Sequence, residues 1–219
     1  MSGSGDATAS EGMTPELAAH LDSVLIGGRE QRAIVISDHD PSWATRAAVL
    51  IHSIRLGLGP IALSVEHIGS TSVPGLAAKA IIDVLLVVRD LDAEQTYVEP
   101  LQALGLQLRV REAGHRMLRT AELDVHLHVL PRGTSEEVAY LDLRDWLRVN
   151  TADRELYEST KRALAARTWE DMNLYADAKS EVIGQVLARA RQWRATRRIE
   201  EESRYHLGTA HSPCPPPAT

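Results

Sequence analysis

The pattern of apolar and polar positions predicts helices near the start of the chain, followed by a series of short strands. A helix is expected after Thr14-Pro15, where a capping residue precedes a proline suited to the first turn. A second helix is expected after Asp40-Pro41, ending at Gly57. The apolar period then shortens to that of strands. We expect a helix-like segment over 92–104 and strands over residues 61–68, 80–88, 106–111, 115–120 and 124–130.

The second half of the chain is predicted to be helical. Thr134 and Glu137 have the spacing of a capping box, and further helices are expected over residues 153–166 and from Glu170 onwards. The fold class is therefore α/β (α+β), with a mixed sheet flanked by helices and a C-terminal helical segment. We expect four parts: a disordered tail (1–12), an α/β core with N-terminal helices (13–131), a helical segment packed on the core (132–205) and a disordered Pro-rich tail (206–219).

Composition narrows the classes of protein. The 219 residues include 24 Lys and Arg against 30 Asp and Glu, a formal charge of −6, so a dedicated nucleic-acid or anionic-membrane surface is not expected. The single cysteine leaves no intramolecular disulfide framework. Without a signal-peptide pattern or a long apolar run, we expect a cytoplasmic protein, a monomer or small homo-oligomer. Phe is absent, so the core is expected to be aliphatic, with Trp43, Trp146 and Trp193 filling volume.

The segment over residues 61–88 carries the most informative chemistry. Glycine and hydroxyl side chains in a loop can surround an anion with donors, and such a loop follows the first predicted strand. An Asp within an apolar strand requires a partner or a cation, and Asp83 is such a residue. We therefore expect an ion-pair partner or a cation at Asp83, and phosphate contacts from Gly69, Ser70, Thr71 and Ser72.

Two other motifs are not met in this segment. In a Walker P-loop a lysine directly follows the second glycine, whereas Lys79 stands apart from Gly75. A nucleophile elbow has glycines two residues before and after its serine, and no serine of the loop meets this condition. A third motif is the nucleotidyltransferase pattern, in which a Gly-Ser turn stands about ten residues ahead of a strand that bears Asp. Gly69-Ser70 and Asp83 fit this pattern.

The run EHIGSTSVPGLAAKAIIDVLL, residues 66–86, closely resembles the signature of the GrpB family, also called UPF0157, a branch of the nucleotidyltransferase-like superfamily. The resemblance extends over residues 30–193, and further pieces are DPSW at 40–43, HLHV at 126–129, LRDWLR at 143–148 and YADAK at 175–179. It implies a nucleotidyltransferase-like fold and a nucleotide site. The cofactors it implies are an NTP, first of all ATP, and a divalent metal ion, Mg²⁺ or Mn²⁺.

The metal ligands expected in this superfamily are incomplete on the first strand. The usual second carboxylate, two residues after Asp83, is replaced by Leu85. Asp124, His126 and His128 alternate along one predicted strand and so share a face. Together with Asp83 they could form a mixed site that suits Mn²⁺, Fe²⁺ or Zn²⁺ at least as well as Mg²⁺. The alternative is that they form the solvent face of a half-buried strand.

Other polar residues are candidate ligand contacts. Arg109, Arg111, His115 and Arg116 form a basic cluster, of which Arg116 is assigned to phosphate and His115 to substrate. Lys79 and Lys179 are further phosphate candidates, Lys161 lies among apolar positions as Lys179 does, and His67 is a substrate candidate. The alternatives are a solvated strand face for the arginines, ion pairing for Lys79 and core packing for His67.

Two functions from different classes follow. The first is a metal-dependent enzyme with Asp83 and His128 as catalytic residues, which transfers a nucleotidyl group to a small-molecule acceptor or forms an adenylate for ligation. The second is a non-catalytic nucleotide-binding or accessory module that stabilises a partner protein. The family resemblance implies this as well, because such domains occur fused to dephospho-CoA kinase. Leu85 favours the module, and Asp83 with the histidine strand favours the enzyme.

Overall fold

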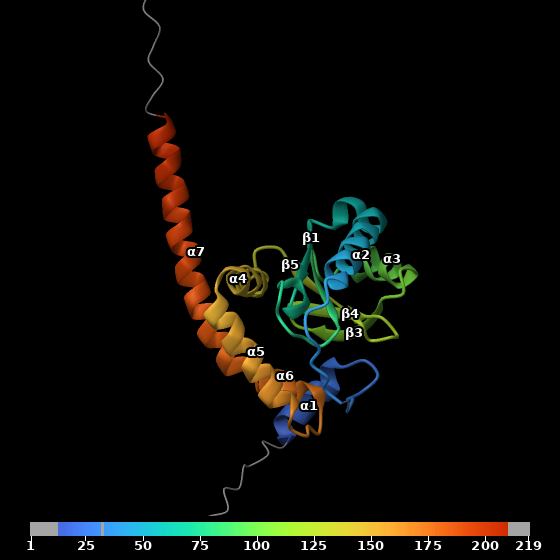
Figure 1. Cartoon of the computed structure of the whole chain (residues 1–219). Helices are drawn as coiled ribbons and strands as arrows, with labels where there is room; N and C mark the ends of the chain where they lie inside the picture. Colours follow the sequence, from blue (N-terminus) through green and yellow to red (C-terminus); the bar gives the residue numbers. More distant parts are fainter. Residues whose placement is uncertain (1–12, 32, 210–219) are drawn as a thin grey trace, which may run out of the picture.

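The computed structural model describes residues 13–31 and 33–209, so the predicted tail at 1–12 and residues 210–219 lie outside it (Figure 1). The strands are β1 (Ser64–Ile68), β2 (Ile82–Val88), β3 (Gln107–Glu112), β4 (His115–Arg119) and β5 (Val125–Pro131). The helices are α1 (Pro15–Val24), α2 (Ser42–Leu58), α3 (Val98–Ala103), α4 (Ser135–Val149), α5 (Thr151–Ala165), α6 (Met172–Asp177) and α7 (Ser180–Thr209). Single 3₁₀ turns are η1 (Gly59–Ile61), η2 (Ser70–Ser72) and η3 (Glu94–Thr96).

All five strands form one mixed sheet in the order β1-β2-β5-β4-β3. The two inner strands β2 and β5 are parallel, and every other neighbouring pair is antiparallel. β2 is buried along most of its length, as its run of apolar residues predicts for a central strand. The predicted class, a mixed sheet flanked by helices, is confirmed.

Helices cover both faces of the sheet (Figure 1). On one face Val84 and Leu86 of β2 pack with Trp43 and Ile54 of α2, and α3 joins the same core. On the other face Leu85 contacts a smaller apolar cluster to which α4 contributes Tyr140 and Leu141. Because successive side chains of β2 point to opposite faces, the strand contributes to two separate cores, one on each side of the sheet. Trp43 is 2% exposed and fills core volume as predicted.

The helices α4 to α7 form a second layer beside the sheet. Val73 and Leu76, from the loop between β1 and β2, pack against Tyr157 of α5 and Val186 of α7. The loop that carries the Gly-Ser sequence is thus enclosed between the sheet and this layer. Trp146 and Trp193 pack ring against ring within the layer, with centroids 5.6 Å apart.

Local capping explains where several helices begin. Thr14 Oγ1 accepts a hydrogen bond from Leu17 N at 3.2 Å at the start of α1. Thr134 Oγ1 accepts one from Glu137 N at 3.3 Å at the start of α4. The Glu137 carboxylate accepts from Gly133 N at 2.6 Å, one residue earlier than a capping box predicts.

The structure differs from the predicted elements in a few places. The helix expected over 92–104 is divided into η3 and the short α3, and the start of the first expected strand is η1. The last helix, expected from Glu170, is interrupted between α6 and α7 at 178–179. Helix α7 runs through Thr209, past the predicted boundary at 205. In the described part of the chain, no helix combines the length and apolar character needed to cross a membrane.

The two sides of α2 differ in a way that can be tested. Trp43→Ala removes a side chain that is 2% exposed, so it should lower the free energy of unfolding by about 3–5 kcal/mol. Leu56→Ala, on the same helix at 72% exposed, should change it by less than about 0.5 kcal/mol. Urea denaturation of both variants measures the difference. Equal effects would contradict the assignment of the core to the Trp43 side.

Candidate functional site

Asp83, His126 and His128 come together on the face of the sheet that is turned toward α4. The parallel register of β2 and β5 pairs Asp83 with His126 and Leu85 with His128. Asp83 Oδ1 lies 3.4 Å from His126 Nδ1 and 3.8 Å from His128 Nε2. One ligand atom from each residue lies within 4.8 Å of the others. This spacing is compatible with a single cation held by all three side chains.

The charge of Asp83 is stabilised by its neighbours. Burial alone would raise its pKa, but the polar contacts with His126 and His128 together outweigh burial and hold the pKa of this carboxyl below its ordinary value. The site therefore presents a carboxylate rather than a carboxylic acid at neutral pH. A half-buried carboxylate between two imidazoles is the donor set expected of a mixed nitrogen and oxygen metal site.

His128 has further polar neighbours behind it. His115 Nε2 lies 3.1 Å from His128 Nδ1, and the two rings stack with centroids 5.3 Å apart. The Tyr140 hydroxyl lies 3.4 Å from the same nitrogen. Burial lowers the pKa of His115 to about 4 and raises that of Tyr140 to about 12, so both are neutral at physiological pH. His115, predicted to contact substrate, instead contacts His128.

The Gly69-Ser70 turn lies directly against Asp83. Gly69 has φ of +69°, a conformation that favours glycine. A Cβ built on Gly69 would lie 2.8 Å from Asp83 Cβ and 2.9 Å from its Cγ, so a larger residue does not fit. Glycine at this position therefore allows the turn to approach the carboxylate.

The hydroxyl groups of the loop have different roles. Ser70 Oγ accepts a hydrogen bond from Lys161 Nζ at 3.0 Å, and Ser70 lines a cavity together with Gly69. Thr71 Oγ1 donates to the Ile81 carbonyl at 3.1 Å, and Ser72 Oγ donates to the Gly69 carbonyl at 2.7 Å. Of the four phosphate contacts predicted within the loop, Gly69 and Ser70 line the cavity, whereas Thr71 and Ser72 do not. The Thr71 and Ser72 side chains instead stabilise the loop itself.

His67 contacts the same loop and helps to fix its conformation. Its side chain points to the opposite face of β1 from Glu66, as the strand alternation predicts. His67 Nε2 lies 3.1 Å from Thr71 Oγ1, and burial lowers the pKa of His67 to about 4. His67 is not among the residues that line the cavity, so the structure does not place it as a substrate contact.

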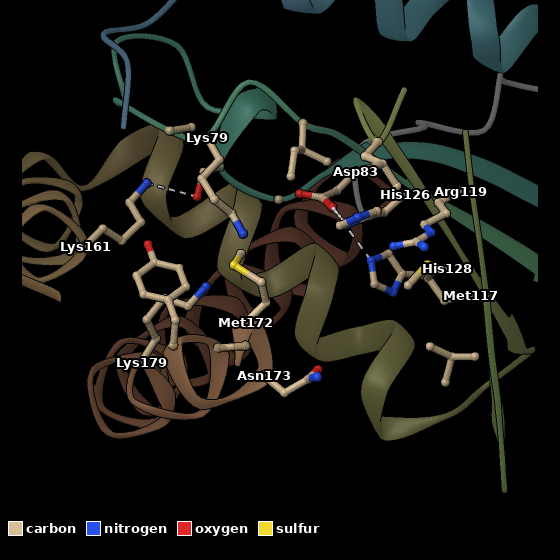
Figure 2. A pocket seen from close by; sticks show the side chains of 18 of the residues that line it. Lys79, Asp83, Met117, Arg119, His126, His128, Lys161, Met172, Asn173 and Lys179 are labelled. Atoms are coloured by element: carbon tan, nitrogen blue, oxygen red, sulfur yellow. Dashed lines mark hydrogen bonds and ion pairs between the residues drawn. The ribbon is translucent and has the colours of Figure 1, made fainter. Parts of the chain in front are cut away.

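A cavity of about 430 Å³ lies between the sheet and helices α5 to α7 (Figure 2). Asp83, His126 and His128 line one part of it. Lysine side chains from the loop and the helical layer line another part, apart from the Asp83 cluster in Figure 2. The lysines are Lys79 before β2, Lys161 on α5 and Lys179 between α6 and α7.

The lysines of the cavity are held by aromatic rings and buried contacts. Lys161 is 3% exposed, donates to the Ala77 carbonyl at 2.5 Å and lies over the Tyr157 ring. Lys179 Nζ lies 4.6 Å from the centroid of the Tyr175 ring, and Lys79 Nζ lies 5.2 Å from it. Burial is the main reason that the pKa of Lys161 falls to about 7 and that of Lys179 to about 8.

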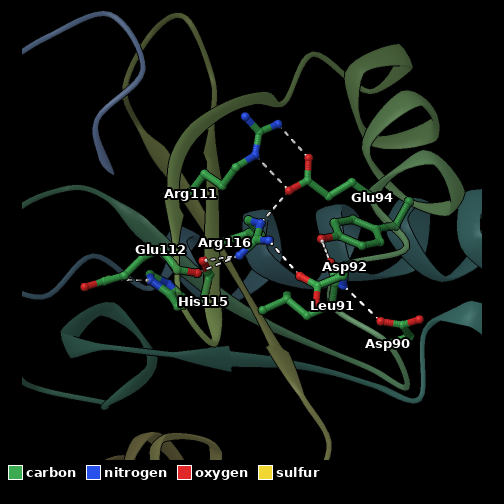
Figure 3. Close-up of polar contacts among 9 residues, drawn as sticks. Asp90, Leu91, Asp92, Glu94, Arg111, Glu112, His115 and Arg116 are labelled. Atoms are coloured by element: carbon green, nitrogen blue, oxygen red, sulfur yellow. Dashed lines mark hydrogen bonds and ion pairs between the residues drawn. The ribbon is translucent and has the colours of Figure 1, made fainter. Parts of the chain in front are cut away.

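Arg116 does not belong to this site, and its predicted role in phosphate binding is wrong. Its side chain points to the opposite face of β4, where its guanidinium bonds Glu94 at 2.5 Å and Asp92 at 3.0 Å (Figure 3). It also donates to the Glu112 carbonyl at 2.6 Å. Arg111 bonds the same Glu94 carboxylate. These arginines stabilise the β3–β4 hairpin.

Asp124 also lies outside the cluster, contrary to the prediction. Its carboxylate accepts hydrogen bonds from Thr120 at 2.7 Å and from Arg46 at 2.6 Å. It precedes β5, and the turn from β4 directs its side chain toward α2 rather than toward Asp83. The grouped donors are therefore Asp83, His126 and His128.

The sequence interpretation missed Arg119 and gave Lys161 no assigned role. Arg119 pairs with His126 across β4 and β5 and lines the cavity. Strict alternation along residues 115–119 places Arg119 on the face opposite to Arg116, so the pattern contained this information. For Lys161, the indication was a lysine among the apolar positions of its helix.

A family model described as GrpB protein matches residues 33–189. The chain belongs to the GrpB family. The UPF0157 protein SCO7215 of Streptomyces coelicolor is 50% identical over 168 residues, which cover 76% of this chain and 89% of that protein. A crystal structure of GrpB from Enterococcus faecalis superposes with a TM-score of 0.65 at 27% identity, covering 73% of this chain and 99% of the other.

A further relative of this GrpB chain is a larger protein. The dephospho-CoA kinase of Mycobacterium tuberculosis H37Rv is 29% identical over 185 residues, which cover 70% of this chain and 45% of the kinase. The chain thus spans less than half the length of that kinase.

The fit of Gly69 against Asp83 predicts different effects at two glycines of this GrpB loop. Gly75→Ala places a side chain at φ +77° with no atom within 4 Å, and should cost about 1–2 kcal/mol of stability. Gly69→Ala adds a clash with Asp83 and should cost roughly 1–3 kcal/mol more. It should also shift the ring resonances of His126 and His128 in NMR spectra. Unchanged histidine resonances in Gly69→Ala would contradict the contact.

Proposed function

We propose that this GrpB protein binds an NTP, first of all ATP, together with a divalent metal ion in the cavity beside β2 and β5. The observation that carries the proposal is that one cavity holds a carboxylate-histidine cluster and, apart from it, several lysines. A nucleoside triphosphate with its metal ion has complementary charges. The proposed reaction is nucleotidyl transfer to a small-molecule acceptor, or formation of an adenylate for ligation.

Asp83, His126 and His128 would hold the metal ion, Mg²⁺ or Mn²⁺. Their donor atoms are already within 4.8 Å of one another, and Asp83 is anionic, so the set fits a divalent cation. A cation bound there neutralises charge that develops on a phosphate. In this proposal Asp83 and His128 are the catalytic residues, and the contacts of His115 and Tyr140 orient His128.

The phosphates would bind between the Gly69-Ser70 turn and the lysines. Lys161 holds Ser70 Oγ through its hydrogen bond, which orients the hydroxyl beside Gly69. Lys79 and Lys179 both lie near the Tyr175 ring, and after burial the positive charge of Lys79 is the next cause that lowers the pKa of Lys179. Repulsion between them is relieved when an anion enters. The GrpB resemblance implies the same use of the Gly-Ser turn.

A second function, an accessory module that stabilises a partner protein, is favoured by Leu85. This residue occupies the position where the usual second carboxylate would stand and is fully buried in an apolar cluster. A module without that carboxylate could bind a nucleotide and not turn it over. The dephospho-CoA kinase relative, of which the matched region covers 45%, is compatible with such a module inside a larger protein.

Nucleotide binding should raise the melting temperature of the protein. At a ligand concentration of a hundred times Kd, the stabilisation is about 2.7 kcal/mol, or roughly 5–10 °C in Tm for a chain of this size. A thermal-shift panel of NTPs with and without Mg²⁺ or Mn²⁺ measures it. Asp83→Asn should abolish the metal-dependent part of the shift, because it removes the anionic ligand.

Asp124→Asn is the matched control for Asp83→Asn. It also removes a carboxylate next to the same pair of strands, but one that bonds Thr120 and Arg46. It should keep the full metal dependence. If no nucleotide changes Tm under any metal condition, the proposed function is refuted. If Asp83→Asn retains the metal dependence, the metal site is elsewhere.

The pH dependence of nucleotide binding should report the buried lysines. With pKa values of about 7 for Lys161 and about 8 for Lys179, both are charged below pH 7 and lose their protons as the pH rises. A bound anion favours the charged forms, so binding above pH 7 takes up protons and the affinity falls between pH 7 and 9. Calorimetry of ATP binding at several pH values, in buffers of different ionisation enthalpy, measures both effects.

Lys179→Met is the control for this pH dependence. The variant should bind ATP more weakly at pH 6.5 and take up fewer protons above pH 7 than the parent protein. An affinity that stays constant or rises between pH 7 and 9 would show that these lysines do not contact the phosphates.

A further inference from the structure

A row of polar side chains crosses the cavity face of the sheet. Asp83 on β2 is paired with His126 on β5, and His126 is paired with Arg119 on β4. All three line the cavity. Because paired residues on neighbouring strands lie side by side, Arg119 is one strand away from a proposed metal ligand.

Arg119 already binds a carboxylate. Its two terminal nitrogens donate to the two oxygens of Glu30 at 3.0 and 2.6 Å, a bidentate pair. Arg109 adds a second positive charge 3.8 Å from the same carboxylate. The Arg119 side chain is 22% exposed and that of Glu30 is 32% exposed, and both residues line the cavity. Glu30 comes from the segment between α1 and α2, far from Arg119 in sequence.

The backbone around Glu30 is fixed independently of this ion pair. The Glu30 carbonyl accepts a hydrogen bond from Met172 N at 3.3 Å, which joins the segment to α6. The Arg109 guanidinium donates to the carbonyls of Ile26 and Gly28. The side chain of Glu30 can therefore leave Arg119 by rotation about its own bonds, with the segment still in place.

The geometry points to Arg119 as the binding site for a carboxylate of the acceptor, with Glu30 filling that site when no acceptor is bound. The ligand class is a small molecule with a free carboxylate, because the guanidinium fork now makes a planar bidentate pair with one. Arg109 supplies additional positive charge, but its guanidinium donates its hydrogen bonds to the carbonyls of Ile26 and Gly28. The inference rests on the proposed function for the acceptor role, whereas carboxylate binding itself is independent of nucleotide and metal.

The position of Arg119 would place a bound acceptor next to the proposed metal cluster. A carboxylate that replaces Glu30 lies beside His126, and so next to the proposed metal cluster. An acceptor held there has its anionic end fixed at the sheet and the rest of the molecule within the cavity. Glu30 also selects against weak ligands, since each ligand must compete with a tethered carboxylate.

The experiment removes the internal competitor. Glu30→Gln keeps the size of the side chain but removes its negative charge, and Glu30→Ala serves as a second variant. Acetate and succinate are titrated into the full-length protein without nucleotide or metal, with acetamide and succinamide as neutral controls. The Nε–Hε resonance of Arg119, assigned by its loss in Arg119→Lys, reports binding. Both Glu30 variants should bind the carboxylates at least about tenfold more tightly than the parent protein, because a tethered competitor acts at millimolar or higher effective concentration.

Asp38→Asn is the matched control for charge removal. It removes an exposed carboxylate that pairs with Arg162 of α5 at 2.6 Å, and neither residue lines the cavity. Asp38→Asn should not increase binding at Arg119, and Glu30→Gln combined with Arg119→Gln should lose the gain. No gain in the Glu30 variants, an equal gain with the amides, or a gain that survives Arg119→Gln overturns the inference. The nucleotide thermal shift of the same variants tests the proposed function separately.

Discussion

The parallel pairing of β2 with β5 is the constraint on which the candidate site depends. It places a carboxylate and two imidazoles on one face, because Asp83 pairs with His126 and Leu85 with His128. A slip of one residue would turn the alternating side chains of one strand to the other face. The apolar side chains prevent this, since Val84 and Leu86 are fully buried against α2 and Leu85 against α4. The two cores therefore determine the geometry of the polar site.

The helical layer contributes the other half of the cavity. Lys161 and Lys179 come from the helices, while Asp83 comes from the sheet, and the Gly-Ser turn lies between them. Lys161 contacts this turn directly through Ser70 and Ala77. A ligand that reaches both the lysines and Asp83 would thus bridge the sheet and the helices, and its binding energy would depend on how closely the two layers pack.

The sequence predicted those parts of the site that depend on local pattern. The Gly69-Ser70 turn and Asp83 stand next to each other in the structure because a turn joined to a strand brings them together within a short stretch of chain. The pairing of Asp83 with the histidines was also foreseen. Arg116 and Asp124 were misassigned, since their roles depend on which face of β4 each residue takes and on how the β4–β5 turn is arranged. Glu30 reaches Arg119 across 89 positions of sequence, which no local pattern reveals.

The misassigned Arg116 affects the cavity from the far side of the sheet. Its guanidinium joins the turn at Asp92 and Glu94 to the carbonyls of Glu112 and His115. The same hairpin carries His115 and Arg119 on its cavity face. The positions of these two side chains therefore depend on an ion-pair cluster, Arg116 with Asp92 and Glu94, that lies outside the cavity on the opposite face of the sheet. A substitution in this cluster would displace strand β4 and so change the shape of the cavity, although every residue that lines the cavity would be unchanged.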